Sequence, residues 1–189
     1  MSNFTAVYDA NLFYPAPLRD LLIRMALTGL FRAKWTDQIN DEWVRNLIKD
    51  RKDIDPDKIK KTVELMNTHV PDCLVTNYEI FIDSLTLPDP DDRHVLAAAI
   101  KSNADVIVTN NLKDFPSSEL SKYDIEAQSP DIFLSHLFDL KPNVFCSVVH
   151  QQRSDLKKPP KTAEEHLEIF YKQGLPITVN KLKDCIDLL

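Results

Sequence analysis

Glycine is scarce in this sequence, with only 2 among 189 residues. Neither of the Gly-rich phosphate loops, GxGxxG and GxxxxGK[ST], is present. The 3 cysteines, Cys73, Cys146 and Cys185, are widely spaced, so neither a zinc ribbon nor a disulfide framework is supported, and we interpret them as buried free thiols. The 5 histidines form no HxH or HExxH pair, and no GxSxG motif occurs. These absences argue against nucleotide-loop enzymes, His-based zinc sites and serine hydrolases.

Long hydrophobic runs are also missing. The longest apolar run, residues 95–100, is far too short to span a bilayer as a helix. The N-terminal residues lack a basic stretch followed by an apolar one, which predicts a cytoplasmic protein with no cleaved signal and no membrane partner. Acids exceed bases, giving a net charge of -6, so the overall field does not favour duplex DNA. An enzyme with an acidic metal site and a local basic surface remains compatible with this balance.

Predicted strands alternate with predicted helices over the first three quarters of the chain. The expected strands are residues 4–8, 73–76, 105–109 and 123–127. The expected helices are residues 15–28, 36–49, 55–69, 89–103 and 130–140, followed by 142–156, 162–173 and 176–189. This order predicts an α/β fold with a mainly parallel central sheet flanked by helices. We expect one domain at residues 1–140 and a helical C-terminal extension at residues 141–189.

Acidic and amide side chains follow two of the predicted strands. Asp9 ends the first strand, and Asn111 and Asp114 follow the strand at residues 105–109. Ligands of open parallel sheets bind beyond the carboxyl ends of the strands, so these side chains are expected at one edge. The alternative for Asn111 and Asp114 is that they only stabilise a turn.

Asp92 lies on the apolar side of its predicted helix. At about 100° per residue it projects near the centre of the stripe formed by Val95, Leu96 and Ala99. A buried carboxylate needs a partner that offsets its desolvation. The alternative is that Asp92 caps the helix, but Asp89 already supplies a cap, so Asp92 is not needed for that role.

Glu42 falls at the edge of the apolar stripe of the helix at residues 36–49. By spacing alone it is better explained as a solvated acid, paired with Arg45 or Asn46, and Asp41 is an equal candidate. His94 is interpreted as a surface or packing residue. Several acids that converge without His or Cys would offer hard oxygen ligands, which select Mg²⁺ or Mn²⁺. Such sites serve phosphoryl chemistry.

Four motifs resemble those of PIN-domain ribonucleases, and more narrowly the VapC-like toxins of bacterial toxin–antitoxin pairs. They are VYDANLFY, DEWVRNL, DPDDRHVLAAAI and DVIVTNNLKDFP, in order, across residues 4–128. The resemblance implies a PIN-like three-layer fold for this part of the chain. The motifs do not cover the helical extension.

The metal ligands implied by the resemblance are acids from each of the four motifs. Asp9 and Asp92 match the first and third acids of the family, and Glu42, rather than Asp41, matches its glutamate. The chain departs from the pattern of many members at the fourth acid. Asn111 stands where they carry Asp, and Asp114, three residues later, takes that role in others.

Two further residues match positions that support the metal ligands from nearby. Asn11 is the polar residue two positions after Asp9, and Thr109 is the small hydroxyl residue that ends the buried strand. Asn111 is placed with them as a supporting residue.

The activity implied is Mg²⁺- or Mn²⁺-dependent endonucleolytic cleavage of RNA by an activated water, leaving 5′-phosphate ends. The implied partners are an RNA substrate, a cognate antitoxin protein and a second copy of the chain in a homodimer. Basic residues that follow the glutamate are candidates for RNA contact: Arg45, Lys49, Arg51 and Lys52.

Two other functions compete with this one. A catalytically inactive PIN-like scaffold that binds RNA or protein is favoured by Asn111 and opposed by the other three acids. A phosphatase of the haloacid-dehalogenase type also has an Asp after its first strand, but it needs Asp-x-Asp, and this chain has Asp9-Ala10-Asn11. The phosphatase therefore ranks last.

Overall fold

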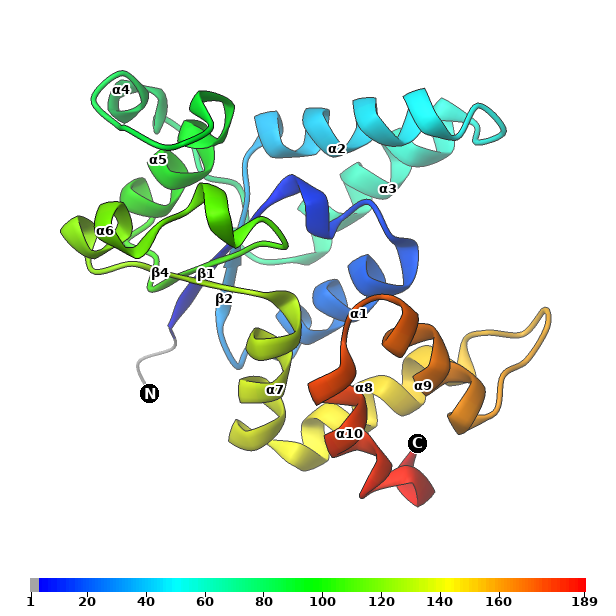
Figure 1. Ribbon diagram of the computed structural model, residues 1–189. Helices are drawn as coiled ribbons and strands as arrows, with labels where there is room; N and C mark the ends of the chain where they lie inside the picture. The colour runs from blue at the N-terminus through cyan, green and yellow to red at the C-terminus, as the bar shows by residue number, and fades with distance from the viewer. Residues whose placement is uncertain (1–3) are drawn as a thin grey trace. The chain divides into compact units, whose positions relative to one another are not determined.

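The computed structural model describes residues 4–189, which form two compact units (Figure 1). The first, here called the sheet unit, comprises residues 4–14 and Phe31–Ser129. The second, the helical unit, comprises Pro15–Leu30 and Pro130–Leu189. The predicted division into residues 1–140 and 141–189 stays a prediction.

The sheet unit is built on four parallel strands in the order β2-β1-β3-β4. The strands are β1 (Thr5–Tyr8), β2 (Arg32–Lys34), β3 (Val106–Val108) and β4 (Glu126–Gln128). β1 and β3 are buried along their whole length, which is typical of the inner strands of a parallel sheet. Their carboxyl ends lie side by side, because Tyr8 pairs in register with Val108.

Helices flank this sheet. They are α2 (Asp37–Asp50), α3 (Pro56–His69), α4 (Glu79–Ile82), α5 (Arg93–Lys101) and α6 (Ser117–Leu120). Short 3₁₀ turns occur at η1 (Ala10–Leu12), η2 (Pro90–Asp92), η3 (Leu112–Asp114) and η4 (Ser121–Tyr123). In Figure 1, α2 and α3 lie to one side of β1 and β2 and α5 to the other, where α5 packs against β1 and β3. The predicted α/β class with a parallel sheet between helices is confirmed.

An aromatic cluster fixes α2 beside the end of β1. Tyr8 stacks on Trp35 with 6.3 Å between ring centroids, and Phe13 meets Trp35 edge-on at 5.5 Å and Trp43 at 6.1 Å. Thr36 caps the start of α2, and its hydroxyl accepts a hydrogen bond from the Ile39 amide. Burial of these large rings holds the first turns of α2 close to the segment that follows β1.

The helical unit contains only helices and turns among its described residues. They are α1 (Ala16–Leu27), α7 (Pro130–Leu140), α8 (Pro142–Ser154), α9 (Ala163–Lys172), α10 (Pro176–Lys183) and the 3₁₀ turn η5 (Ile186–Leu188). α9 starts with a capping box between Thr162 and Glu165. The carboxylate of Asp131 in α7 accepts hydrogen bonds from the Ile177 and Thr178 amides at the start of α10.

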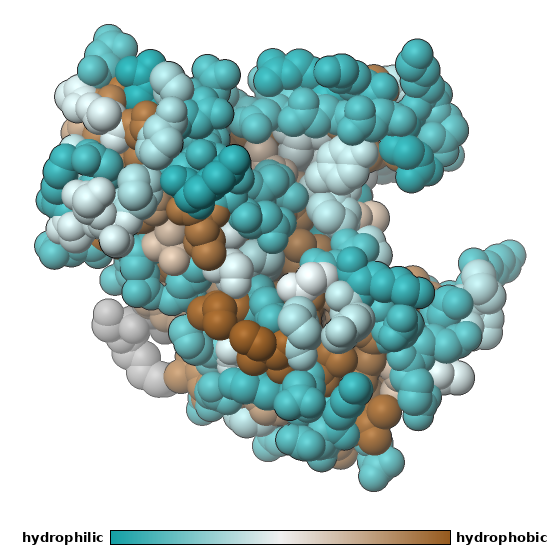
Figure 2. Space-filling view, in the orientation of Figure 1, coloured by the Kyte–Doolittle hydropathy of each residue, from teal (hydrophilic) through white to brown (hydrophobic). Residues whose placement is uncertain are grey.

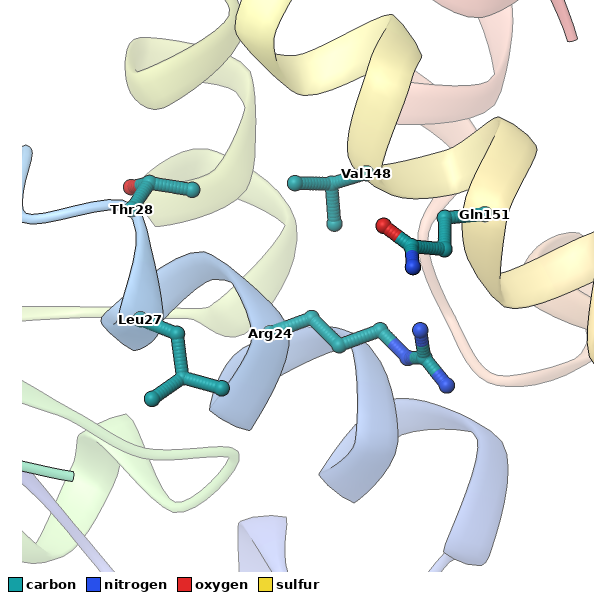
Figure 3. Close-up of a pocket in the computed structure, with 5 residues that line it drawn as sticks. All are labelled: Arg24, Leu27, Thr28, Val148 and Gln151. Atoms are coloured by element: carbon teal, nitrogen blue, oxygen red, sulfur yellow. The ribbon is translucent and has the colours of Figure 1, made fainter. Parts of the chain in front are cut away.

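A pocket of about 290 Å³ is lined by residues of α1 and α8 within the helical unit. In Figure 3, Thr28 and Arg24 of the α1 segment lie on the side of Val148 and Gln151 of α8, and the Leu27 side chain points away from α8. The Arg24 guanidinium already forms ion pairs with Asp20 and Asp155. None of these residues belongs to the predicted site.

The cysteines are free thiols, as predicted, although Cys185 is only partly buried. Cys146 and Cys185 face each other with 2.9 Å between their sulfur atoms. No helix within residues 4–189 is long and apolar enough to cross a membrane.

Several predicted elements differ from the structure. The strand expected at residues 73–76 is wrong: only Leu74 forms an isolated bridge, with Trp35. β2 was not predicted, since three residues with two basic side chains give no strand pattern. The last strand starts at Glu126 rather than at residue 123, and the final helix ends at Lys183.

Candidate functional site

Asp9 lies directly after β1 and is 3% exposed. Its carboxylate accepts hydrogen bonds from the Thr109 hydroxyl at 2.6 Å and from the Asn11 side-chain amide. Burial raises the pKa of Asp9, the Thr109 hydrogen bond lowers it, and the charge of Glu42 raises it further. The structure therefore brings both predicted supporting residues, Asn11 and Thr109, to this carboxylate.

The loop after β3 is tied to the same group of side chains. The Thr109 hydroxyl accepts a hydrogen bond from the Asn111 backbone amide at 2.9 Å, and the Asn11 side-chain oxygen accepts one from the Asn110 amide at 3.1 Å. In the described chain, no hydrogen bond engages the side chain of Asn111. Asp114 follows in η3 and is 9% exposed.

Asp92 stands at the junction of η2 and α5 and makes no capping hydrogen bond. Asp89 caps this segment instead, by accepting from the Asp91 amide at 2.9 Å. One carboxylate oxygen of Asp92 is buried and has no hydrogen-bond partner among the described residues. Its pKa is raised to about 7, first by burial and then by the negative charges of Asp9, Asp89, Asp114 and Glu42.

Glu42, in the second turn of α2, reaches His94 of α5. The Glu42 Oε2 atom lies 3.3 Å from His94 Nε2, and the Glu42 side chain is 32% exposed. Within residues 4–189, Glu42 forms no ion pair with Arg45 and no hydrogen bond with Asn46. His94 is 3% exposed and contacts a candidate ligand, so it is not a surface residue, and sequence spacing gives no sign of this pairing.

Asp92 thus lies within electrostatic range of the other three predicted acids, and Asp9 also lies within electrostatic range of Glu42. As placed, no three His, Cys, Asp or Glu side chains in residues 4–189 form a ready metal cage. The oxygen donors, the unpartnered oxygen of Asp92 and its raised pKa nevertheless fit a divalent cation that would offset the repulsion. Asp9, Glu42, Asp92 and Asp114 are the residues that could hold such a cation.

The predicted RNA-contacting residues lie on the last turns of α2 and just beyond it. Arg45, Lys49 and Lys52 are exposed and have no hydrogen-bond or ion-pair partner within the described residues. Arg51 differs from them, because its guanidinium donates two hydrogen bonds to the Asp53 carboxylate, with N–O distances of 2.8 and 2.7 Å. On the face shown in Figure 2, the α2 and α3 region is mostly hydrophilic.

Comparisons with known proteins agree with this architecture. A family model described as PIN domain matches residues 5–113, more than half of the chain, and the chain belongs to the PIN-domain family. A second model, described as VapC50 C-terminal domain, matches residues 130–184. The predicted kinship with VapC-like PIN proteins is confirmed.

One relative is a Mycobacterium tuberculosis protein named "Putative ribonuclease VapC50". It is 42% identical over 82 residues, which cover 43% of this chain and 48% of that protein. The match therefore spans about half the length of this curated relative. No solved structure matches the chain.

Proposed function

We propose that this protein is an Mg²⁺- or Mn²⁺-dependent endoribonuclease that hydrolyses RNA phosphodiester bonds. The observation that carries the proposal is the group of four acids that follow β1, lie on α2, stand at the junction of η2 and α5, and lie in η3. Within this group the Asp92 pKa is raised to about 7 by burial and by its neighbours. Membership of the PIN-domain family and the relative's name as a ribonuclease support the same chemistry.

The side chains around the acids have separate tasks in this proposal. A bound divalent ion would supply charge neutralisation at the phosphate and a lower pKa for an attacking water. Thr109 and Asn11 hold the Asp9 carboxylate in one orientation through their hydrogen bonds. The exposed cations Arg45 and Lys49 attract the RNA backbone toward the end of α2.

The biological setting follows by analogy with VapC-like proteins. We propose that the protein is a cytoplasmic toxin, that a cognate antitoxin protein restrains it, and that two copies form a homodimer. Family kinship supports these three points. The helical unit contains the region matched by the VapC50 C-terminal domain and contributes none of the four proposed metal ligands.

The test is cleavage of a defined RNA mixture by the purified protein with Mg²⁺, with Mn²⁺ and with EDTA. Asp9→Asn and Asp92→Asn should each lower the cleavage rate by at least about 100-fold. Each variant removes one negative charge that would hold the divalent ion, and the ion contributes several kcal/mol of transition-state stabilisation. Asp41→Asn is the matched control, because Asp41 neighbours Glu42 but is exposed, and its activity should match that of the unmodified protein.

Two results would contradict the proposal. Cuts that survive in both Asp variants would show that these acids do not form the active site. Absence of cuts from folded protein that binds Mn²⁺ would favour the non-cleaving scaffold, for which Asn111 at the fourth acid position is the supporting feature.

A further inference from the structure

His94 is a buried titratable residue that the proposed mechanism has not used. It lies on α5, two positions after Asp92, and is 3% exposed. Its Nε2 atom is 3.3 Å from Glu42 Oε2 on α2, so the contact joins two helices that are far apart in the sequence. Within the described chain, His94 is the only hydrogen-bonding or ion-pair partner of Glu42.

Packing alone does not account for a histidine at this position. The other ring nitrogen, Nδ1, is buried without a hydrogen-bond partner among the described residues. A buried polar atom without a partner is unfavourable, and a leucine would fill a similar volume without that cost. Within residues 4–189, the close polar contact of the ring is the one with Glu42, and this contact favours an imidazole over a leucine.

The candidate ligands differ in how firmly they are held. Two donors, Thr109 and Asn11, fix the Asp9 carboxylate, whereas no hydrogen bond fixes the buried oxygen of Asp92. Glu42 has a longer side chain than either aspartate, and more rotatable bonds must be ordered to place its carboxylate. His94 provides for Glu42 the kind of support that Thr109 provides for Asp9.

We propose that His94 is a positioning residue, whose Nε2–H donates to Glu42 and holds that carboxylate ready for the divalent ion. This inference rests on the proposed function, since it takes Glu42 as a ligand. Partners that orient metal ligands affect metal affinity by about 10–100-fold when they are removed. Loss of the imidazole is therefore expected to raise the metal dissociation constant while the protein still folds.

The experiment is a Mn²⁺ titration of the full chain without RNA, which yields the dissociation constant directly. His94→Leu keeps volume and removes the donor, so its dissociation constant should rise by about 10–100-fold. His94→Gln places an amide N–H near the Nε2 position and should restore binding to within a few-fold. His94→Asn reaches only the Nδ1 position and should resemble His94→Leu.

A double variant separates positioning from packing. In a Glu42→Gln background, His94→Leu should change the Mn²⁺ dissociation constant little, because the carboxylate that His94 positions is gone. An equal loss in both backgrounds would overturn the inference, and so would unchanged binding in His94→Leu or failure of His94→Gln to restore it. If His94→Leu does not fold, the Gln and Asn variants still decide the question by their difference.

RNA cleavage measured in parallel distinguishes the inference from the proposed function. Protein that binds Mn²⁺ in a His94-dependent way but cuts no RNA would refute the nuclease and leave His94 as a positioning residue. Protein that cuts RNA with a Mn²⁺ affinity independent of His94 would refute the inference alone. Protein that binds no Mn²⁺ in any form would refute both.

Discussion

The two units treat buried polar groups differently. In the sheet unit the unpartnered atoms are Asp92 Oδ2, within range of three further candidate ligands, and His94 Nδ1, beside one of them. In the helical unit they belong to Gln152 and His166, and burial lowers the pKa of His166 to about 4, which keeps its ring neutral near pH 7. The helical unit also buries one carboxylate, that of Asp131, but the Ile177 and Thr178 amides satisfy it with hydrogen bonds. The sheet unit concentrates charge at one place, which is typical of a functional site rather than of a core.

The largest expected effect comes from the core of the helical unit. Phe170 on α9 is fully buried, so Phe170→Ala should lower the free energy of unfolding by about 3–5 kcal/mol, through lost burial and the cavity left behind. Tyr171 is 57% exposed on the same helix, and Tyr171→Ala should change stability by no more than about 0.5 kcal/mol. Urea unfolding measures both, and equal losses would show that α9 does not pack as described.

Asp92→Asn should instead stabilise the protein. The folded pKa of Asp92 is about 7, above its ordinary value of 3.8, so the folded state holds a proton that the unfolded state releases between these pH values. Stability from this group is therefore lost as the pH rises from about 4 to 7. With EDTA at pH 8, the gain in the variant should be about 2 kcal/mol after allowance for solvent screening of a half-exposed group.

The measurement for Asp92 is the unfolding free energy at pH 8 and at pH 4, with the exposed Asp91→Asn as the control. The gain should be much smaller at pH 4, where the folded carboxyl is protonated and the unfolded carboxyl, close to its ordinary pKa of 3.8, is about half protonated. A gain that is the same at both pH values would mean that the charge of Asp92 is not its cause.

His166 should show the opposite pH dependence. Its folded pKa is about 4, below the ordinary 6.5, first because of burial and then because of the charges of Arg153 and Arg24. Stability from this ring is present above pH 6.5 and is lost as the pH falls toward 4. Relative to the unmodified protein, His166→Leu should gain about 1–2 kcal/mol between pH 7 and pH 4, with screening allowed for. Thermal melts across this range test it, and the exposed His136→Gln should show no such gain.

The smallest expected effect concerns RNA affinity. Lys49 is exposed and has no ionic partner within the described chain, whereas Arg51 is already bound to Asp53. Lys49→Ala should lower the slope of log affinity against log salt by about 0.7, the value for one phosphate contact on a single strand. Arg51→Ala should change it less. Binding of a catalytically silent Asp9→Asn background to RNA at several salt concentrations gives both slopes, and the reverse order would remove Lys49 from the interface.

Local signals were enough to predict much of the fold. Thr36, Asp55 and Thr162 each cap a helix where the predicted ranges 36–49, 55–69 and 162–173 begin, because a cap depends on residues only a few positions apart. β2 escaped prediction because Arg32–Lys34 becomes a strand only through pairing with β1. The segment at residues 73–76 carries strand-forming residues, but a single bridge to Trp35 is all that the tertiary structure gives it.

The candidate site was predictable where the chain topology alone brings residues together. Asp9 and Thr109 follow neighbouring parallel strands, so their proximity follows from the sheet. The contact between Glu42 and His94 joins two helices whose relative placement no local pattern specifies. Resemblance to the family selected Glu42 over Asp41, but neither resemblance nor spacing identified the buried histidine beside it.

The grouping of α1 with the C-terminal helices has a consequence for synthesis on the ribosome. The buried face of α1, which includes Leu18, Leu21 and Met25, packs against α8 and α9, about 100 residues or more further along the chain. At about 5–20 residues per second, these apolar side chains are synthesised roughly 6–23 s before the first residue of α8. The apolar face of α1 therefore stays without its native partners while the sheet unit is translated, which exposes this helix to aggregation or to capture by chaperones.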